Sequence, residues 1–155
     1  MTWNSGYSFN LDALTMKNMI KADARRRLDE KLTRLAAASD RVKLITVGKT
    51  TRGLDWEIAI ISSPANLAKL DRYKEISQRL AHGRGLTDAE ARALAREGKA
   101  IVHIDGGLHS TEVAGAQQSI ALAYKLASTR GDPDVDAILD NVILMLWPTL
   151  NPDGQ

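Results

Sequence analysis

The stretch KAIVHIDGGLHSTEVAG, residues 99–115, constrains the fold of this chain more than any other. Its first seven residues form a continuous β-prone run, which is typical of a strand buried on both faces. Two glycines end the run, and apolar residues then recur at helical spacing as far as residue 127. A strand followed directly by a helix predicts an α/β protein, in which helices cover a sheet.

Predicted helices and strands also follow one another in the part of the chain before this stretch. Apolar positions at helical spacing predict a helix over residues 12–38. The segments RVKLITVG and LDWEIAIIS, residues 41–48 and 54–62, alternate as two strands of an antiparallel hairpin with a glycine-containing turn. The expected sheet is therefore mixed, because it begins with an antiparallel pair.

Helices are predicted between the hairpin and the strand at 99–105. Apolar residues recur every three or four positions from Pro64 to Leu80. Thr87 and Glu90 have the spacing of a capping box, so a short helix is expected to follow and to end at Gly98. After the central stretch, a short helix near 132–140 and a second buried strand, NVILMLW, complete the pattern.

Composition excludes several classes of function. With 44% apolar and 26% charged residues, the 155-residue chain has the composition of a soluble globular protein. A net charge of +2, without a basic stripe and aromatic residues, excludes nucleic acid as the expected partner. The apolar runs are too short to span a bilayer, so no membrane partner is expected. The N-terminus has no signal peptide pattern, which leaves the localisation unknown.

The chain has no cysteine, so any metal must be held by His, Asp or Glu. His109 and Glu112 are three residues apart, just beyond the carboxyl end of a predicted strand, where α/β proteins bind ligands. One turn of helix would bring this imidazole and carboxylate together, and both are ligands of zinc. The pair supplies two of the three protein ligands that a catalytic zinc site needs.

Simpler interpretations of the same residues remain open at this point. Glu112 could favour the positive end of a helix, with Ser110 or Thr111 as its cap, and His109 could be a hydrogen-bonded loop residue. Phosphate binding lacks a GxGxxG or Walker pattern, and a nucleophile at Ser110 lacks a GxSxG elbow.

Three motifs in order resemble one known family. GKTTRGLDWEIAIIS, then IVHIDGGLHSTEVAG, then PTLNPDG match the start of the catalytic domain of the zinc carboxypeptidases, the carboxypeptidase A-like metallopeptidases. The resemblance covers residues 41–155 and implies an α/β, phosphorylase/hydrolase-like fold with a mixed sheet flanked by helices. It also implies Zn²⁺ as cofactor, a peptide or small peptide-like substrate, and hydrolysis of C-terminal peptide bonds by zinc-activated water.

The resemblance assigns roles to particular residues. His109 and Glu112 match the first two zinc ligands. The four residues of the NPDG motif, Asn151, Pro152, Asp153 and Gly154, match a structural turn beside the site. We also consider Asp105 as the acceptor that orients the metal-binding histidine. His103 is expected to pack in the core and His82 to face solvent.

Several parts of the family's site have no match in this chain. The third zinc ligand, the substrate-binding arginines and the glutamate general base are expected downstream of Gln155. We therefore interpret residues 1–155 as the N-terminal portion of one catalytic domain whose sheet is incomplete at its C-terminal end. Within it, residues 1–40 are a helical lead-in, 41–155 hold the sheet and metal site, and 64–98 are a helical insertion. Such a sheet is expected to expose an edge through which copies of the chain self-associate.

Two other functions fit the same residues. The chain could be a catalytically inactive carboxypeptidase-like module that only binds a partner, or part of a related zinc-dependent amino-acid deacylase. Stabilisation of the chain by zinc would distinguish the zinc-dependent enzymes from the binding module, because a ligand that binds only the folded state stabilises it. Many relatives are exported, so the resemblance allows a secreted or periplasmic location.

Overall fold

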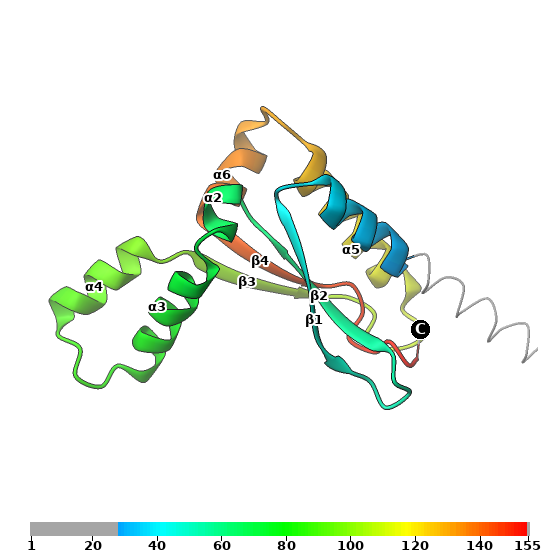
Figure 1. Ribbon diagram of the computed structural model, residues 1–155, viewed down its shortest axis with the longest axis horizontal. Coiled ribbons are helices and arrows are strands. Elements are labelled where there is room, and N and C mark those ends of the chain that lie inside the picture. The colour runs from blue at the N-terminus through cyan, green and yellow to red at the C-terminus, as the bar shows by residue number, and fades with distance from the viewer. Residues whose placement is uncertain (1–27, 155) are drawn as a thin grey trace, which may run out of the picture.

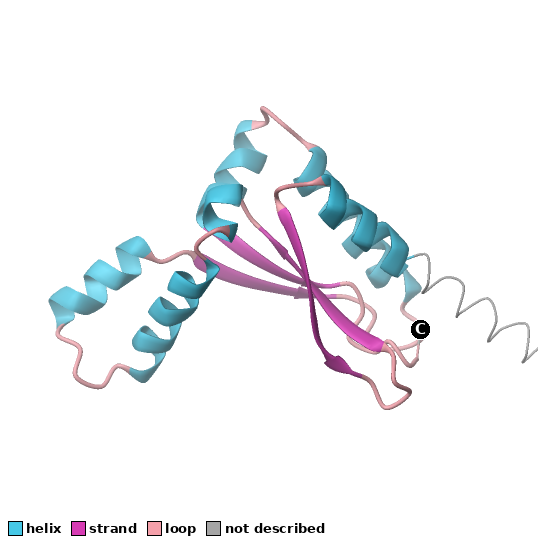
Figure 2. Cartoon of the chain, viewed as in Figure 1, coloured by secondary structure: helices cyan, strands magenta, loops and turns pink. Residues whose placement is uncertain are grey.

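A computed structural model of the chain describes residues 28–154, which form a mixed four-stranded sheet with helices on both faces (Figures 1 and 2). In chain order, a helix over 28–38 precedes β1 (Val42–Lys49), β2 (Asp55–Ile61), α2 (Pro64–Leu67), α3 (Leu70–His82), α4 (Asp88–Glu97), β3 (Ala100–Asp105), α5 (Val113–Ser128), α6 (Pro133–Asn141) and β4 (Val142–Trp147). The predicted α/β class and mixed sheet are confirmed. Residues 12–27 of the predicted first helix lie outside the described residues.

The strands lie in the order β1-β2-β4-β3. β1 and β2 form the predicted antiparallel hairpin, and β2 is antiparallel to β4. β3 runs parallel to β4 in an unbroken register from Ala100 opposite Val142 to Asp105 opposite Trp147. The carboxyl ends of β3 and β4 therefore lie side by side at the same end of the sheet. The loops that follow these two strands can contribute residues to one site.

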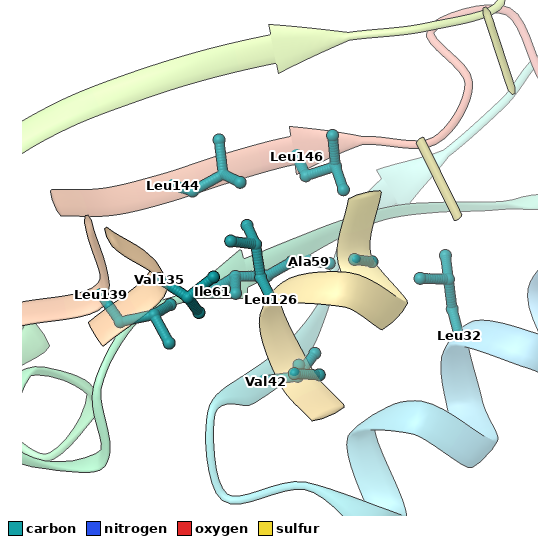
Figure 3. Close-up of a cluster of buried hydrophobic side chains, with 11 residues drawn as sticks. Leu32, Val42, Ala59, Ile61, Leu126, Val135, Leu139, Leu144 and Leu146 are labelled. Carbon is teal, nitrogen blue, oxygen red and sulfur yellow. The ribbon is translucent and has the colours of Figure 1, made fainter. Parts of the chain in front are cut away.

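β2 and β4 are the central strands, and their side chains alternate between two cores. One core lies between the sheet and the helices 28–38, α5 and α6 (Figure 3). Its buried residues are Leu32, Val42, Ala59, Ile61, Ala123, Leu126, Ala127, Val135, Leu139, Leu144 and Leu146. The other core lies under α3 and consists of Ile58, Ile60, Tyr73, Ile76 and Ile143. Apolar residues on both faces make this pair of strands the centre of the protein.

A buried polar network ties α2 to the end of α6. The Asn66 amide donates to the carbonyl oxygens of Leu139 and Asp140, both at 3.0 Å, and to the Ser62 hydroxyl at 3.1 Å. The Tyr73 hydroxyl donates to the Asn66 carbonyl oxygen at 3.1 Å. The last carbonyls of a helix have no partner within it. Asn66 satisfies the Asp140 carbonyl, and it shares the Leu139 carbonyl with the Ser62 hydroxyl and the Ser63 amide.

α3 and α4 form a helical hairpin that extends from the sheet on the side away from α5 (Figure 1). The predicted capping box at its second helix is present: the Glu90 amide donates to the Thr87 hydroxyl, and the Thr87 amide donates to the Glu90 carboxylate. The Arg72 guanidinium joins the two helices through a bidentate pair with Glu97, at 2.7 and 2.6 Å. No helix among residues 28–154 has the length and apolar character needed to cross a bilayer.

The burial predicted for the strand at 99–105 is wrong. Every residue of β3 is exposed, because β3 lies at the edge of the described sheet and not between two strands. His103, expected in the core, is also exposed, and its ring centroid lies 5.9 Å from that of Trp147. Val113 and Tyr124 fit the helical pattern of the following segment but are 56% and 64% exposed. The apolar pattern identified the elements correctly, but not what covers them.

Candidate metal site

The site begins where β3 and β4 end side by side. The Gly106 amide donates to the Trp147 carbonyl at 3.0 Å, and the Leu150 amide donates back to the Gly106 carbonyl at 2.9 Å. These bonds continue the parallel pairing one step past both strands. As a result, the loop after β3 is held against the turn after β4 at positions that precede His109 and Asn151.

Gly106 is required by a close approach to α5. A Cβ atom at this position would lie 2.7 Å from the Ser119 hydroxyl oxygen and 2.8 Å from the Gly115 carbonyl oxygen. Real Cβ contacts essentially never fall below 3.0 Å. A larger residue would push the first turns of α5 away from the sheet, and those turns follow Glu112 directly.

Gly107 is required by its backbone conformation. Its φ of +59° lies in the left-handed region, which side chains disfavour. This turn aims the Gly107 carbonyl at the segment after β4, where it accepts from the Asn151 amide at 3.3 Å and the Thr149 hydroxyl at 3.2 Å. The two glycines thus have separate roles: one permits the packing of α5, and the other redirects the chain toward His109.

His109 and Glu112 face each other across the turn that precedes α5, which begins at Val113, and not within a turn of helix as predicted. The Nδ1 atom of His109 lies 2.7 Å from Oε1 of Glu112, and the His109 backbone amide donates to Oε2 at 3.2 Å. The two side chains are 70% and 54% exposed. Hydrogen bonds from the His109 side chain and amide lower the pKa of the Glu112 carboxyl below its ordinary value.

The alternative in which Ser110 or Thr111 caps the helix is not supported. The N-cap of α5 is Glu112 itself, and its side chain makes no capping hydrogen bond. The Glu112 carboxylate instead turns back to His109. Glu112 does lie at the positive end of α5, and His109 is a hydrogen-bonded loop residue, so these two simpler interpretations fit the structure as well as a metal site does.

The donor atoms of this pair suit zinc. Neutral imidazole nitrogen and carboxylate oxygen bind zinc at about 2.0–2.2 Å, so two such atoms on one tetrahedral ion lie about 3.3 Å apart. The observed 2.7 Å between Nδ1 and Oε1 would widen by about half an ångström, within reach of small side-chain rotations. Within residues 28–154, no group of three or more His, Asp or Glu side chains is arranged to hold a metal ion.

The turn after β4 lies against the residue that follows His109. The Gly154 amide donates to the backbone and side-chain oxygens of Asn151, both at 3.1 Å. A Cβ atom on Gly154 would lie 3.1 Å from Cβ of Ser110 and 2.6 Å from Nδ2 of Asn151. Thus the structure brings the NPDG residues and His109 into one region, although they are separated by about 40 residues in sequence.

Asp153 in this turn also contacts the tip of the β1–β2 hairpin. Its Oδ2 atom accepts from the Arg52 amide at 3.2 Å, and its carbonyl accepts from the Arg52 guanidinium at 3.5 Å. Its Oδ1 atom is buried and has no hydrogen-bond partner within residues 28–154. Sequence reasoning did not identify Arg52, because nothing in TTRG indicates a contact with a residue 101 positions later.

The other candidate residues lie apart from the pair. Asp105 ends β3 opposite Trp147 and is exposed, and within the described residues no hydrogen bond joins it to His109. His82 ends α3 on the helical hairpin and is exposed, as expected. His103 lies within β3 beside Trp147.

Fold and site together define an α/β protein with a His-x-x-Glu pair, suited to a divalent metal, at the carboxyl ends of two parallel strands. The sequence model described as zinc carboxypeptidase matches residues 28–155, and the chain belongs to this family. A search of curated proteins gave no significant match.

Proposed function

We propose that this chain provides the first two zinc ligands, His109 and Glu112, of a metallocarboxypeptidase that hydrolyses C-terminal peptide bonds. The observation that carries the proposal is the 2.7 Å approach of His109 Nδ1 to Glu112 Oε1 on an exposed surface at the strand ends. A hydrogen bond between two such exposed side chains contributes little to stability, because water can replace either partner. Membership of the zinc carboxypeptidase family supports the same function.

Each residue of the pair has a defined part in holding the metal. The Glu112 carboxylate is ionised at neutral pH, as an ordinary glutamate is, so it needs no proton loss before it binds a cation. The His109 amide holds Oε2, which leaves Oε1 directed at the imidazole. Bound zinc would supply a Lewis acid that polarises the scissile carbonyl and acidifies a water molecule. Among residues 28–154, no third His, Asp or Glu side chain joins this pair in a group that could hold a metal ion.

A metal-binding histidine commonly donates its second ring N–H to a carboxylate or carbonyl. The sequence suggested Asp105 for this part. Asp153 is a second candidate, because its buried Oδ1 atom lacks a donor within residues 28–154 and its turn packs against Ser110. Replacing the carboxylate that accepts the second ring N–H of His109 is expected to weaken zinc binding about 10- to 100-fold. Zinc titrations of Asp153→Asn and Asp105→Asn decide between the two carboxylates.

The direct test of the proposal is calorimetric titration of the chain with zinc. We expect weak binding by the wild-type chain, because two ligands hold the ion loosely, and no detectable binding by His109→Ala or Glu112→Ala. His82→Ala is the matched control, since His82 is an exposed histidine far from the pair. If His109→Ala binds zinc as the wild type does, the pair is not the metal site.

A hydrolysis assay tests whether the described site is sufficient for catalysis. We expect no hydrolysis of a peptide or of an N-acyl amino acid by residues 1–155 with zinc, because the general base is expected elsewhere. Turnover that disappears in His109→Ala would show that this chain holds a complete site. The preferred substrate in that case would distinguish a carboxypeptidase from an amino-acid deacylase.

A further inference from the structure

A buried hydroxyl holds the loop that carries His109. Thr149, in the turn after β4, is 7% exposed, and its hydroxyl donates to the Gly107 carbonyl at 3.2 Å. Thr149 comes two residues after the end of β4, and Gly107 comes two residues after the end of β3 and two before His109. A side chain therefore joins the segments that follow two neighbouring strands, at a position shielded from solvent.

The backbone hydrogen bonds between the same two segments are uneven. The Leu150 amide lies 2.9 Å from the Gly106 carbonyl oxygen, whereas the Asn151 amide lies 3.3 Å from the Gly107 carbonyl oxygen. Amide–carbonyl hydrogen bonds usually measure about 2.7–3.2 Å, so the backbone bond to Gly107 is longer than usual. Because Gly107 is buried, its carbonyl relies on the Thr149 hydroxyl for a second partner.

The Gly107 peptide leads directly to the metal pair. Its left-handed conformation, with a φ of +59°, sets the direction in which the chain leaves β3 toward His109. The His109 amide donates to Oε2 of Glu112, and Nδ1 of the His109 ring lies 2.7 Å from Oε1. Rotation of the Gly107 peptide would therefore move both the amide and the ring that meet Glu112.

We propose that Thr149 is a positioning residue for the metal pair: its hydroxyl fixes the Gly107 peptide, and the fixed peptide places His109 against Glu112. Thr149 acts through Gly107 and is not itself a ligand. Its effect on zinc binding rests on the proposed function, whereas its effect on the loop is a property of the metal-free chain. The two segments and the bond that joins them all lie within residues 28–154.

Substitutions at Thr149 separate the hydroxyl from the rest of the side chain. Thr149→Val keeps the branched shape and removes the donor, whereas Thr149→Ser keeps the donor and removes a methyl group. Thr149→Ala differs from Thr149→Ser only in the hydroxyl, so this pair gives the same comparison if valine prevents folding. Thr87→Ala is the matched control for stability, because it removes a threonine hydrogen bond at the capping box before α4.

Backbone order parameters from nuclear magnetic resonance test the effect on the metal-free loop. We expect Leu108 and His109 to be rigid in the wild-type chain, with values of about 0.85, and to fall toward about 0.6 in Thr149→Val. Thr149→Ser and Thr87→Ala should remain rigid there, because order parameters are measured on the folded state and do not follow a loss of global stability. A Thr149→Val loop as rigid as that of the wild type, or a wild-type loop that is already flexible, would overturn the proposal.

Zinc titration tests the effect on the metal pair. Thr149→Val is expected to bind zinc about two- to tenfold more weakly than the wild type, the range that the net contribution of one hydrogen bond spans. Thr149→Ser and Thr87→Ala should bind it as the wild type does. Wild-type affinity in Thr149→Val, with binding still abolished in His109→Ala, would overturn this proposal alone. Wild-type affinity in His109→Ala would overturn the proposed function, and the order parameters would then decide whether Thr149 fixes the loop.

Discussion

Asn66 and Glu112 are both polar residues joined to a neighbour by side-chain hydrogen bonds, but they differ in burial. Asn66 is 5% exposed, and its amide is fully engaged with the end of α6 and with Ser62. Glu112 is more than half exposed and bonds mainly to His109. Removing a buried partner leaves other groups unpaired, whereas an exposed partner is replaced by water. The Asn66 network should therefore determine stability, and the Glu112 pair should determine metal binding.

The largest loss of unfolding free energy is expected at the buried residue, Asn66. Asn66→Ala would leave the Asp140 carbonyl and the Tyr73 hydroxyl without their hydrogen-bond partner, whereas the Leu139 carbonyl would keep the Ser62 hydroxyl and the Ser63 amide. We expect a cost of about 3 kcal/mol in unfolding free energy. Urea denaturation measures this loss. Asn141→Ala is the control, because its side chain bonds the Ala137 carbonyl at an exposed position, and it should cost well under 1 kcal/mol. Equal losses would show that burial does not separate the two kinds of site.

Gly106→Ala tests whether the loop before His109 is packed against α5 as tightly as residues are packed in the core. The added methyl group would collide with the backbone of Gly115 and the Ser119 hydroxyl, and we expect a loss of about 2 kcal/mol. Gly48→Ala is the matched control, since nothing lies within 4 Å of a Cβ atom there and its φ is not positive. Thermal unfolding of both variants gives the comparison. A Gly106→Ala protein as stable as Gly48→Ala would mean that α5 is not held against this loop.

The Thr87–Glu90 capping box is an intermediate case, exposed but geometrically specific. Thr87→Ala is expected to cost about 1 kcal/mol. Hydrogen bonds from Thr87 lower the pKa of Glu90, so the folded state favours the carboxylate. This contribution is present at neutral pH and is lost as the pH falls below the ordinary value of about 4.5 and through the lowered pKa. The stability difference between wild type and Thr87→Ala should shrink over that acidic range. A difference that grows with acidity would contradict the assignment.

The smallest effect on stability is expected at the His109–Glu112 pair. Glu112→Ala in the absence of metal should change the unfolding free energy less than any variant above, because both partners are exposed. With zinc added, only the wild-type chain should gain stability. Thermal unfolding with and without zinc measures both quantities. A metal-free loss comparable to that of Asn66→Ala would make His109–Glu112 a structural pair.

The sequence predicted those parts of the molecule that depend on neighbouring residues. The capping box and the hairpin turn, where Gly53 has a φ of +79°, are set within a few positions. The approach of His109 to Glu112 follows from their three-residue spacing at a turn. The sequence showed that two glycines end the strand before this pair, and the structure separates the packing role of Gly106 from the conformational role of Gly107.

The features that sequence reasoning missed depend on distant partners. The Asn66 bonds to Leu139 and Asp140 join residues 73 and 74 positions apart, and Arg52 meets Asp153 across 101 positions. No local pattern contains such pairs. The exposure of β3 was missed for a related reason, since an apolar run reveals that a strand is apolar but not which strands lie beside it.

The strand order also affects how the protein is made. β2 is completed at Ile61, but its neighbour β4 begins only at Val142, so the hairpin must wait while the intervening residues are synthesised. At about 5–20 residues per second, those roughly 80 residues take about 4–16 seconds. During that interval the apolar residues of β2 lack the strand that will bury them. The β1–β2 hairpin therefore completes its sheet only after most of the described chain has been synthesised.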